Sequence, residues 1–378
     1  MPLYSFSPLP LRPTVVSSPV MQPGMKKITV AMSGGVDSSV AAALLVREGH
    51  EVSGAFMKNW SDEADPCTGE CAWKQERQDA LRVAATLGIP FETYDFEDDY
   101  RREVVDYMVR EYAAGRTPNP DVLCNSKVKF HLFLRRALEN GADMIATGHY
   151  ARVEDGALLA GVDANKDQSY FLHRLTKEQL SRTLFPVGHL PKPEVRRLAK
   201  EFGLPTAEKK DSQGICFIGK VDLANFLGAK IAARTGPIVT TDGHVVGRHP
   251  GAVPFTIGQR HGLGVGGGAP YFVVDKDVAR NTVVVARDQA ELDASALVAN
   301  EAQWISGAAP PLPLACKARI RYRQPLQDCT VTATATGLHV DFARPQRAIS
   351  PGQFIVFYQE DRCLGGAVIE RAENRGQR

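Results

Sequence analysis

A short glycine-rich segment between a predicted strand and a predicted helix constrains the fold of this chain more than any other feature. The segment AMSGGVDSS, residues 31–39, follows the β-branched run KITV and precedes the helix-forming run VAAALLVRE. Glycines let a backbone approach an anion closely, and the start of a helix presents unpaired N–H groups at the positive end of its dipole. The segment therefore predicts a phosphate-binding loop at the end of a strand, with Asp37 as the helix N-cap.

This loop differs from the better-known nucleotide-binding loops. A Walker-type loop carries a lysine for the β and γ phosphates, and a dinucleotide-binding loop has the spacing G-x-G-x-x-G. Residues 28–50 contain neither feature. The loop therefore need not serve transfer of a γ-phosphoryl group, and an ordinary tight turn between strand and helix is the alternative interpretation.

Alternating strand-like and helix-like runs from Lys26 to about Arg152 predict the fold class. Such alternation indicates an α/β fold with a doubly wound parallel sheet, covered by helices on both faces. We expect strands at 27–32, 51–57, 90–96 and 143–151, and helices at 37–48, 75–88, 101–115 and 176–203. Because ligands of these sheets bind at the carboxyl ends of the strands, the loops after the strands should face one crevice.

The pattern of the sequence changes past about residue 236, where short β-like runs and turns replace the alternation of strand-like and helix-like runs. We expect four segments: a disordered tail at 1–25, a catalytic domain at 26–218, a small β-rich central domain at 219–290 and a C-terminal β-barrel at 295–372. A D-G turn within PIVTTDGHVVG predicts a hairpin. The prolines of the tail disfavour an amphipathic targeting helix, and Met25 is an alternative start.

Composition limits the classes of function. Hydrophobic residues make up 44% of the 378 residues, charged residues make up 23%, and the formal net charge is +2. The chain can therefore bury a sizeable core, and no apolar run approaches the roughly 20 residues that span a bilayer. Seven cysteines do not indicate a disulfide framework, so we expect a cytoplasmic protein without a membrane partner.

Two of the cysteines have contexts that favour reactivity. Cys124, in PNPDVLCN, is predicted to lie just before a helix that starts near Ser126, with Lys127 and Lys129 close by. A helix N-terminus and nearby cations both lower the pKa of a thiol. Cys216 lies in the lysine-flanked segment KKDSQGICFIGK. The pair suits chemistry in which one thiol delivers sulfur and the other attacks, and a buried structural role is the alternative for Cys124.

The other cysteines carry weaker signals. Cys67 and Cys71 have the spacing C-x3-C, which is at most half of a zinc site, so we expect them to be variable loop cysteines. An iron–sulfur cluster held by other thiols is an alternative that the sequence leaves open. Cys316, Cys329 and Cys363 lie in β-rich apolar runs and are expected to fill the core. We therefore assign no metal ligand to any of these residues.

Several motifs resemble those of one enzyme family. SGGVDSS is similar to the PP-loop of ATP pyrophosphatases, which adenylate a substrate and release pyrophosphate. The segments PNPDVLCN, TGHYAR, KDQSYFL, DSQGICFI, IGQRHGLG, RYR and SPGQ occur in the order found in bacterial-type tRNA-specific 2-thiouridylases, or tRNA-uridine 2-sulfurtransferases. The resemblance covers about residues 26–370, which is nearly the whole chain.

The resemblance implies a reaction and its participants. ATP, with Mg²⁺, would adenylate O2 of the wobble uridine of tRNA (position 34) and release pyrophosphate. Sulfur from a cysteine persulfide would then replace the activated oxygen and give 2-thiouridine. The implied partners are tRNAs (those for Lys, Glu and Gln), a persulfide sulfur-donor protein and a thiol reductant that resets a disulfide.

The resemblance also assigns roles to the residues that match the family motifs. It implies Cys124 as the nucleophile and Cys216 as the persulfide carrier. The expected ATP contacts are Ala31, Met32, Ser33, Gly34, Gly35, Val36, Asp37, Ser38, Met57 and Gly148. The expected tRNA contacts are Asn119, Pro120, Asp121, His149, Lys166, Asp167, Gln168, Arg321, Tyr322 and Gln353. A buried core histidine is the alternative for His149.

The predicted barrel supports RNA binding independently of the family. Between Cys316 and Arg347, six Lys or Arg residues stand against two Asp residues. The run KARIRYR alternates, which predicts that its basic residues share one face of a strand, with Tyr322 on the other. A basic strand suits contact with an RNA backbone, and a solvated polar face is the alternative.

Two other classes of function stay open. An ATP-dependent amination or ligation of the PP-loop kind would need an ammonia source or an amino-acid site, and it has no use for paired thiols. A tRNA-binding or sulfur-relay protein would not need an intact loop. Exchange of pyrophosphate into ATP, stimulated by tRNA, separates these alternatives from a thiouridylase.

Overall fold

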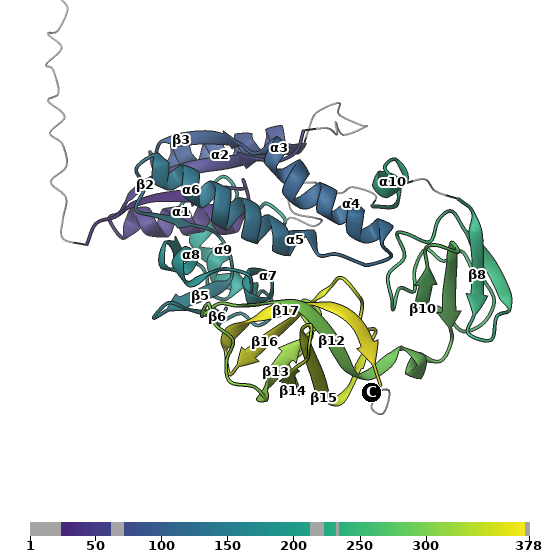
Figure 1. The fold of residues 1–378 in the computed structure, drawn as a ribbon. Helices are drawn as coiled ribbons and strands as arrows, with labels where there is room; N and C mark the ends of the chain where they lie inside the picture. Colours follow the sequence, from purple (N-terminus) through teal and green to yellow (C-terminus); the bar gives the residue numbers. More distant parts are fainter. Residues whose placement is uncertain (1–23, 62–71, 212–222, 232–233, 375–378) are drawn as a thin grey trace, which may run out of the picture.

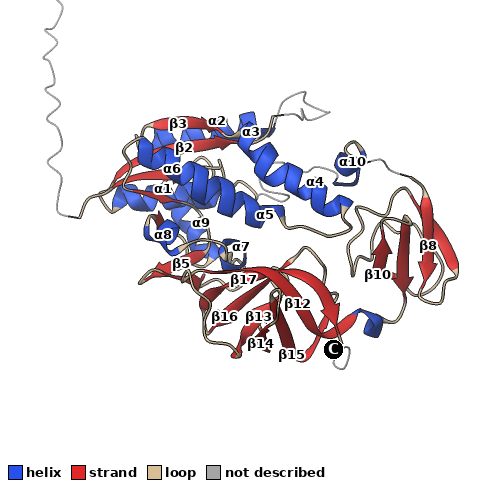
Figure 2. Cartoon of the chain, in the orientation of Figure 1, coloured by secondary structure: helices blue, strands red, loops and turns tan. Residues whose placement is uncertain are grey.

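The computed structural model describes residues 24–61, 72–211, 223–231 and 234–374. Cys67, Cys71 and Cys216 lie outside these residues, so the predictions for them are not addressed by the fold. In the described part, an α/β unit, a small β-sheet and a β-barrel follow one another along the chain (Figures 1 and 2). The predicted fold class is therefore confirmed.

A five-stranded sheet with the order β3-β2-β1-β4-β7 forms the centre of the α/β unit. Its strands are β1 (Lys27–Ala31), β2 (Glu51–Lys58), β3 (Phe91–Asp95), β4 (Met144–Ala146) and β7 (Thr183–Leu184). Each neighbouring pair is parallel. The chain moves outward from β1 to β3 and then returns to the other side of β1 as β4. The loops after β1 and β4 therefore meet at the point where the strand order reverses, which is where such sheets bind ligands.

Side chains of the strands alternate between two apolar cores, one on each face of the sheet. Ile28 and Val30 of β1 pack against α1 (Val36–Arg47), α2 (Ala72–Leu87) and α9 (Lys192–Glu201). Ala31 and Met57 belong to the second core. That core is covered by α3 (Glu97–Tyr100), α4 (Asp106–Ala113), α5 (Pro120–Leu123) and α6 (Leu134–Glu139), with the π-helical segments η1 (Arg101–Val105) and η2 (Cys124–Phe133) between them. Burial on both faces explains why the strands are almost continuously apolar.

Several predicted element boundaries are wrong. Gly35, not Asp37, is the N-cap of α1, and Asp37 lies in the first turn. The predicted strand at 143–151 ends at Ala146. The predicted helix at 176–203 is replaced by α8 (Lys177–Ser181), β7 and α9. Pro186 and Pro191 lie between β7 and α9, and proline disfavours a continuous helix because it lacks the N–H group.

The small central sheet has the strand order β10-β11-β8-β9. Its strands are β8 (Gly236–Thr240), β9 (Val245–His249), β10 (Phe272–Asp277) and β11 (Thr282–Ala286), and α10 (Leu223–Gly228) precedes them. β8 and β9 are antiparallel, and Gly243 between them has a φ of +88°. The hairpin predicted from the D-G turn is therefore confirmed.

Six strands close into the C-terminal barrel. They are β12 (Asp293–Trp304), β13 (Leu314–Arg319), β14 (Gln327–Ala333), β15 (Leu338–Arg347), β16 (Phe354–Gln359) and β17 (Arg362–Glu373), after the short helix η3 (Gln289–Leu292). Their order is β12-β15-β14-β13-β16-β17, and pairing of β12 with β17 closes the ring. Closure leaves no free sheet edge within the ring.

A hairpin of the α/β unit extends the sheet of the barrel. β5 (Ala151–Glu154) pairs with β6 (Ala157–Ala160), and β6 pairs with β17. The short helix α7 (Ser169–Leu172) lies at the same junction, where the hydroxyl of Tyr170 donates a hydrogen bond to the carbonyl of Phe354 at 3.0 Å. The barrel is thus joined to the α/β unit by backbone pairing and by buried side chains (Figure 1).

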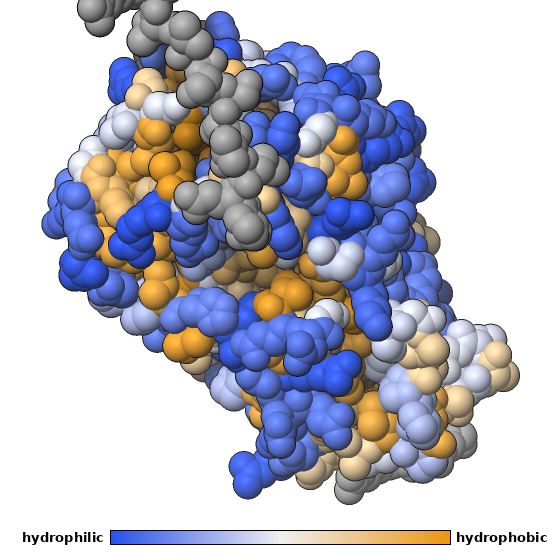
Figure 3. All heavy atoms as spheres, turned by 90° about the vertical axis from the view of Figure 1, so that its left-hand side faces the viewer, coloured by the Kyte–Doolittle hydropathy of each residue, from blue (hydrophilic) through white to orange (hydrophobic). Residues whose placement is uncertain are grey.

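Among the described helices, none has the length and apolar character needed to cross a bilayer. On the face shown in Figure 3, hydrophilic residues surround smaller hydrophobic areas. The exposed large hydrophobic side chains Leu138, Val162 and Val245 come from separate parts of the fold, which is ordinary for a globular surface.

Candidate active site

The glycine loop between β1 and α1 has a backbone that only glycine can adopt at one position. Gly34 has a φ of +74°, and a Cβ atom there would lie 2.1 Å from the backbone oxygen of Glu76 in α2. At the N-cap, Gly35 offers no side chain to the start of α1. The N–H groups of the first helical turn have no acceptor within the helix, so they are available to an anion.

The loop after β4 lies against this helix start. A Cβ atom at Gly148 would be 2.5 Å from the backbone nitrogen of Ser38. The structure therefore brings Gly148 together with the predicted ATP contacts of the loop, which are Ala31, Met32, Ser33, Gly34, Gly35, Val36, Asp37 and Ser38. Met57, near the end of β2, is buried in the apolar core below. These residues are grouped at the carboxyl ends of β1, β2 and β4.

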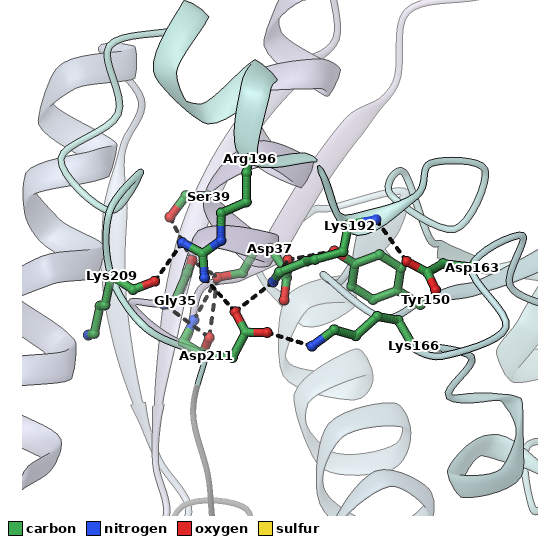
Figure 4. Close-up of polar contacts among 12 residues, drawn as sticks. Gly35, Asp37, Ser39, Tyr150, Asp163, Lys166, Lys192, Arg196, Lys209 and Asp211 are labelled. Carbon is green, nitrogen blue, oxygen red and sulfur yellow. Dashed lines mark hydrogen bonds and ion pairs between the residues drawn. The ribbon is translucent and has the colours of Figure 1, made fainter. Parts of the chain in front are cut away.

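Asp37 is held by two side chains that come from distant parts of the sequence. Its Oδ1 accepts hydrogen bonds from the hydroxyl of Tyr150 at 2.8 Å and from Nζ of Lys192 at 2.7 Å. Lys192 is the first residue of α9, on the same face of the sheet as α1. A lysine is therefore present at the loop in space, although none is present in the loop sequence (Figure 4).

Asp211 gathers three cations beside the loop. Its carboxylate contacts Nζ of Lys166 at 2.5 Å, Nζ of Lys192 at 2.8 Å and a guanidinium nitrogen of Arg196 at 2.7 Å (Figure 4). Burial would raise the pKa of Asp211, but the hydrogen bonds from Lys166 and Lys192 outweigh it and lower the pKa to about 2. Asp211 is therefore ionised throughout the neutral range.

A fourth cation fixes the back of the loop. Nζ of Lys209 donates to the carbonyl of Gly34 at 3.0 Å and pairs with Asp79 of α2 at 2.7 Å. Arg196 donates to the backbone carbonyls of Ala207 and Lys209 and so fixes the segment that carries Lys209. Four cations paired with three carboxylates therefore lie beside the helix start, whose N–H groups suit the phosphates of a nucleotide.

Sequence reasoning missed Lys192, Arg196, Lys209 and Asp211 as members of this site. They lie in a stretch that reads as a charged surface helix followed by a loop, and no spacing links them to the glycine loop. Tyr150 was visible within the TGHYAR motif, but its bond to Asp37 was not. Only the fold, which packs α9 beside α1, brings these groups together.

Cys124 occupies a different position from the one predicted. The helix starts at Pro120, with Asn119 as the N-cap whose side chain accepts from the N–H of Val122, and it continues through η2 and α6. Cys124 therefore lies inside the helix, about one turn after its start. It is completely buried in the same apolar core as Met57. Proline at the first helical position favours this early start, because its fixed φ suits a helix and its missing N–H is not needed there.

Several predicted tRNA contacts lie at the junction between the α/β unit and the barrel. The amide nitrogen of Gln353 donates to the carbonyls of Thr117 and Pro118, at 2.8 and 3.1 Å. Its amide oxygen is 3.5 Å from Nδ2 of Asn119. Asn119 and Gln353 are thus brought together beside the helix that carries Cys124, and Pro120 and Asp121 form the first turn of that helix.

Asp167 and Gln168 are internal supports of the same junction. Asp167 is 3% exposed, accepts from the N–H groups of Gly161 and Ser169, and pairs with Arg319 of the barrel at 3.3 Å. The side chain of Gln168 accepts from the N–H of Tyr150 at 3.0 Å. Their neighbour Lys166 belongs instead to the charged cluster around Asp211.

Arg321 and Tyr322 also make internal contacts. Arg321 donates to the carbonyls of Ile257 and Ala348, at 3.2 and 2.5 Å, and burial lowers its pKa. The ring of Tyr322 lies 4.5 Å from that of Phe171, in the α/β unit. Arg321 therefore joins the barrel to the central unit, and Tyr322 joins it to the α/β unit.

The predicted basic face of a barrel strand is wrong. β13 ends at Arg319, so Arg321 and Arg323 follow the strand rather than lie on it. Arg319 is buried and paired with Asp167, whereas Lys317 is exposed and pairs with Asp328 at 2.9 Å. The alternation in the sequence did not show that Arg319 would form an ion pair with Asp167, a buried residue from another part of the chain.

His149 has the surroundings of a core histidine. It is 8% exposed, its Nδ1 lies 2.7 Å from the hydroxyl of Thr147, and its ring packs against Phe130 and Phe185. Burial holds the pKa of His149 well below its usual range, with a further contribution from Lys129. The imidazole is therefore neutral at neutral pH.

The fold and the loop define a class of protein: an α/β protein whose doubly wound sheet carries a PP-loop where its strand order reverses. Residues 26–220 match the family described as the tRNA methyl transferase HUP domain. Residues 224–287 match the tRNA methyl transferase PRC-barrel domain, and residues 294–369 match the aminomethyltransferase beta-barrel domain.

Two full-length relatives identify the particular family. The tRNA-specific 2-thiouridylase MnmA 2 of Geobacillus kaustophilus is 50% identical over 364 residues, covering 94% of this chain and 98% of that protein. The tRNA-specific 2-thiouridylase MnmA of Stenotrophomonas maltophilia is 51% identical over 356 residues, covering 91% and 93%. The chain belongs to the family of tRNA-specific 2-thiouridylases.

Proposed function

We propose that this chain is an ATP-dependent sulfurtransferase that converts uridine in tRNA to 2-thiouridine. Its relatives are named tRNA-specific 2-thiouridylases. The observation that carries the proposal is the PP-loop, with its cluster of cations, in a chain that matches 2-thiouridylases over nearly its whole length. We further propose the wobble uridine, position 34, as the target, in the tRNAs for Lys, Glu and Gln.

In this proposal, the loop at 32–35 and the first turn of α1 bind the phosphates of ATP. The unpaired N–H groups and the nearby ammonium groups of Lys166 and Lys192 favour a polyanion there. Met57 would contact the adenine, and Gly148 would contact the nucleotide through its backbone. Mg²⁺ would neutralise phosphate charge, and Asp37 offers a carboxylate in the first turn of α1.

ATP is needed because the 2-oxygen of uracil is a poor leaving group. Transfer of AMP to O2 releases pyrophosphate and turns that oxygen into part of a good leaving group. Attack of sulfur at C2 then expels AMP and leaves 2-thiouridine. The base must leave the anticodon stack for this, because C2 cannot be reached inside it.

We propose that Cys216 carries the sulfur as a persulfide and that Cys124 is the nucleophile. Attack of the Cys124 thiolate on the inner sulfur of the persulfide releases hydrosulfide and forms a Cys124–Cys216 disulfide, and the hydrosulfide then attacks C2. A persulfide-donor protein would reload Cys216 after a thiol reductant has opened the disulfide. Because Cys124 is completely buried in the described structure, tRNA binding must open a path to it.

For tRNA we propose a surface that includes the barrel, with Asn119, Pro120 and Asp121 near the target base. The other candidates are His149, Lys166, Asp167, Gln168, Arg321, Tyr322 and Gln353. Those that are buried or bonded within the protein would act by holding the barrel in place rather than by direct contact. The division at 26–218, 219–290 and 295–372 and a cytoplasmic location belong to the same proposal.

Mass spectrometry of nucleosides from treated tRNA tests the proposal. Incubation of the full chain with unmodified tRNA, ATP, Mg²⁺ and a persulfide source should yield 2-thiouridine. A nucleoside in which nitrogen replaces oxygen would favour the amination alternative. tRNA binding without any modified nucleoside would favour a binding or sulfur-relay protein.

A further inference from the structure

We propose that Cys316 and Cys329 form a reversible redox site on the barrel, at which a small-molecule disulfide converts the two thiols into a protein disulfide. The two residues belong to β13 and β14, away from the PP-loop, and the proposed reaction at Cys124 and Cys216 does not use them. The sequence indicates only core-filling cysteines here, so the inference depends on how the strands pair.

The register of the barrel places the two thiols together. β13 and β14 are antiparallel neighbours, and Cys316 stands directly opposite Cys329 in the ladder. Their Sγ atoms are 3.7 Å apart. Directly opposed residues of antiparallel strands have Cα atoms about 4.5–5.5 Å apart, which lies within the range of about 4.4–6.8 Å that disulfides span. The bond can therefore form without a change of register.

A cavity gives reagents access to this pair. It has a volume of about 490 Å³, and both cysteines line it together with Lys317, Asp328, Tyr358 and Glu360. Cys316 is partly exposed, whereas Cys329 is 6% exposed. The nearby Cys363 is a contrast, because it is 1% exposed and burial raises the pKa of its thiol to about 12.

The two thiols have unequal reactivity. A hydrogen bond from the Cys329 thiol lowers the pKa of Cys316, and the same bond raises the pKa of Cys329. The thiolate is the nucleophile in disulfide exchange, so the more exposed Cys316 attacks first. Cys329 is then the resolving thiol.

The exchange is balanced with a disulfide such as oxidised glutathione as the oxidant. The Cys316 thiolate attacks one sulfur of the oxidant, breaks its S–S bond and releases one glutathione. Cys329 gives up its proton and attacks the Cys316 sulfur of the mixed disulfide, which releases the second glutathione. The two cysteines are oxidised, the oxidant is reduced, and an excess of reduced thiol reverses both steps.

The resulting bond would link β13 to β14 at the cavity. Of these two strands, β13 also carries Arg319. Arg319 pairs with Asp167 across the junction with the α/β unit. Oxidation would therefore fix the hairpin that docks the barrel, and we expect the melting temperature of the oxidised chain to rise.

Peptide mapping of the full chain after incubation in graded mixtures of oxidised and reduced glutathione tests the inference. Acid quenching, alkylation of free thiols and trypsin digestion should yield the peptides 288–317 and 324–347 joined by a disulfide, at a mass two hydrogens below their sum. The joined species should grow with the oxidised fraction and disappear with dithiothreitol. Two alkylated peptides in the most oxidising mixture would overturn the proposal.

Variants separate this pair from the proposed catalytic thiols. Cys329→Ser should accumulate a glutathione adduct on Cys316, because the resolving thiol is gone. The double variant Cys124→Ser/Cys216→Ser should form the joined peptide as the unaltered chain does. A stable adduct on Cys316 while Cys329 is intact, or loss of the joined peptide in the double variant, would contradict a self-contained site.

Discussion

Lys192 and Asp37 are 155 positions apart in the sequence, yet the ammonium of one lies 2.7 Å from the carboxylate of the other. A helix start that has two ammonium groups beside it can bind an anion. A helix start that has only a carboxylate beside it would repel one. At the scale of single residues, we therefore expect nucleotide binding to depend on Lys192 and Lys166, which α9 and the loop after β6 supply. The loop sequence by itself lacks this charge.

Replacing Lys192 tests this role. Lys192→Met should weaken ATP binding by about ten-fold or more, because a hydrogen-bonded charge contributes roughly 1.5–3 kcal/mol. Lys200→Met is the matched control on the same helix, since Lys200 is 61% exposed and pairs with Glu208. Titration with ATP measures both. Equal affinity in the two variants would remove Lys192 from the nucleotide site.

The proposed thiol roles give a second test at this scale. Cys124→Ser and Cys216→Ser should each abolish formation of 2-thiouridine, while tRNA binding stays nearly unchanged. Cys67→Ser is the control and should keep full activity, because no catalytic role is proposed for it. Thiolation by either catalytic variant at the rate of the unaltered chain would refute the two-thiol scheme.

At the scale of elements, β13 and the loop after β6 are joined by a buried ion pair. Arg319 pairs with Asp167 at 3.3 Å, and its guanidinium lies 4.8 Å from the ring centre of Tyr358. A buried pair need not add net stability, but removal of one partner leaves an uncompensated buried charge. The pair therefore fixes how the barrel is docked on the α/β unit.

Substitutions two positions apart on β13 test the docking. Arg319→Met should lower the free energy of unfolding by about 3 kcal/mol or more, because it leaves the buried Asp167 carboxylate without its charged partner. Lys317→Met removes an exposed pair on the same strand and should change it by less than about 1 kcal/mol. Denaturant unfolding compares the two. Similar small losses would show that the ion pair does not hold the junction.

The sequence predicts an element only where the signal for that element is local. The parallel sheet and the loop were predictable because alternation and the SGGVDSS motif are local signals. The early helix start at Pro120 was missed although Asn119 and Pro120 are local signals for it. The docking of Arg319 and the cluster around Asp211 were not predictable, because they depend on tertiary contacts, such as β6 with β17, that no local period encodes.

At the scale of the whole molecule, the barrel and the α/β unit meet around a buried histidine that must stay uncharged. His173 is fully buried, its Nδ1 lies 2.7 Å from the carbonyl of Tyr170, and its ring centre is 4.9 Å from that of Phe354. Burial lowers the pKa of His173 to about 3. The junction is therefore built for a neutral imidazole.

The stability of the molecule should consequently fall as the pH drops below about 6.5. The unfolded chain binds a proton at His173 below that pH and the folded chain does not, so about 2 kcal/mol is lost by pH 5. His173→Gln should show a shallower loss between pH 7 and 5, whereas His244→Gln, at an 81% exposed side chain, should not change the slope. Unfolding free energies with equal slopes in all three chains would contradict this origin.

We propose that cleavage of ATP to AMP and pyrophosphate activates the uridine oxygen for replacement by sulfur. Quantifying nucleotide products and 2-thiouridine in the same reaction tests it most directly. We expect one AMP and one pyrophosphate for each 2-thiouridine formed, and none without tRNA. Sulfur incorporation without consumption of ATP, or with ADP and phosphate as the products, would contradict it.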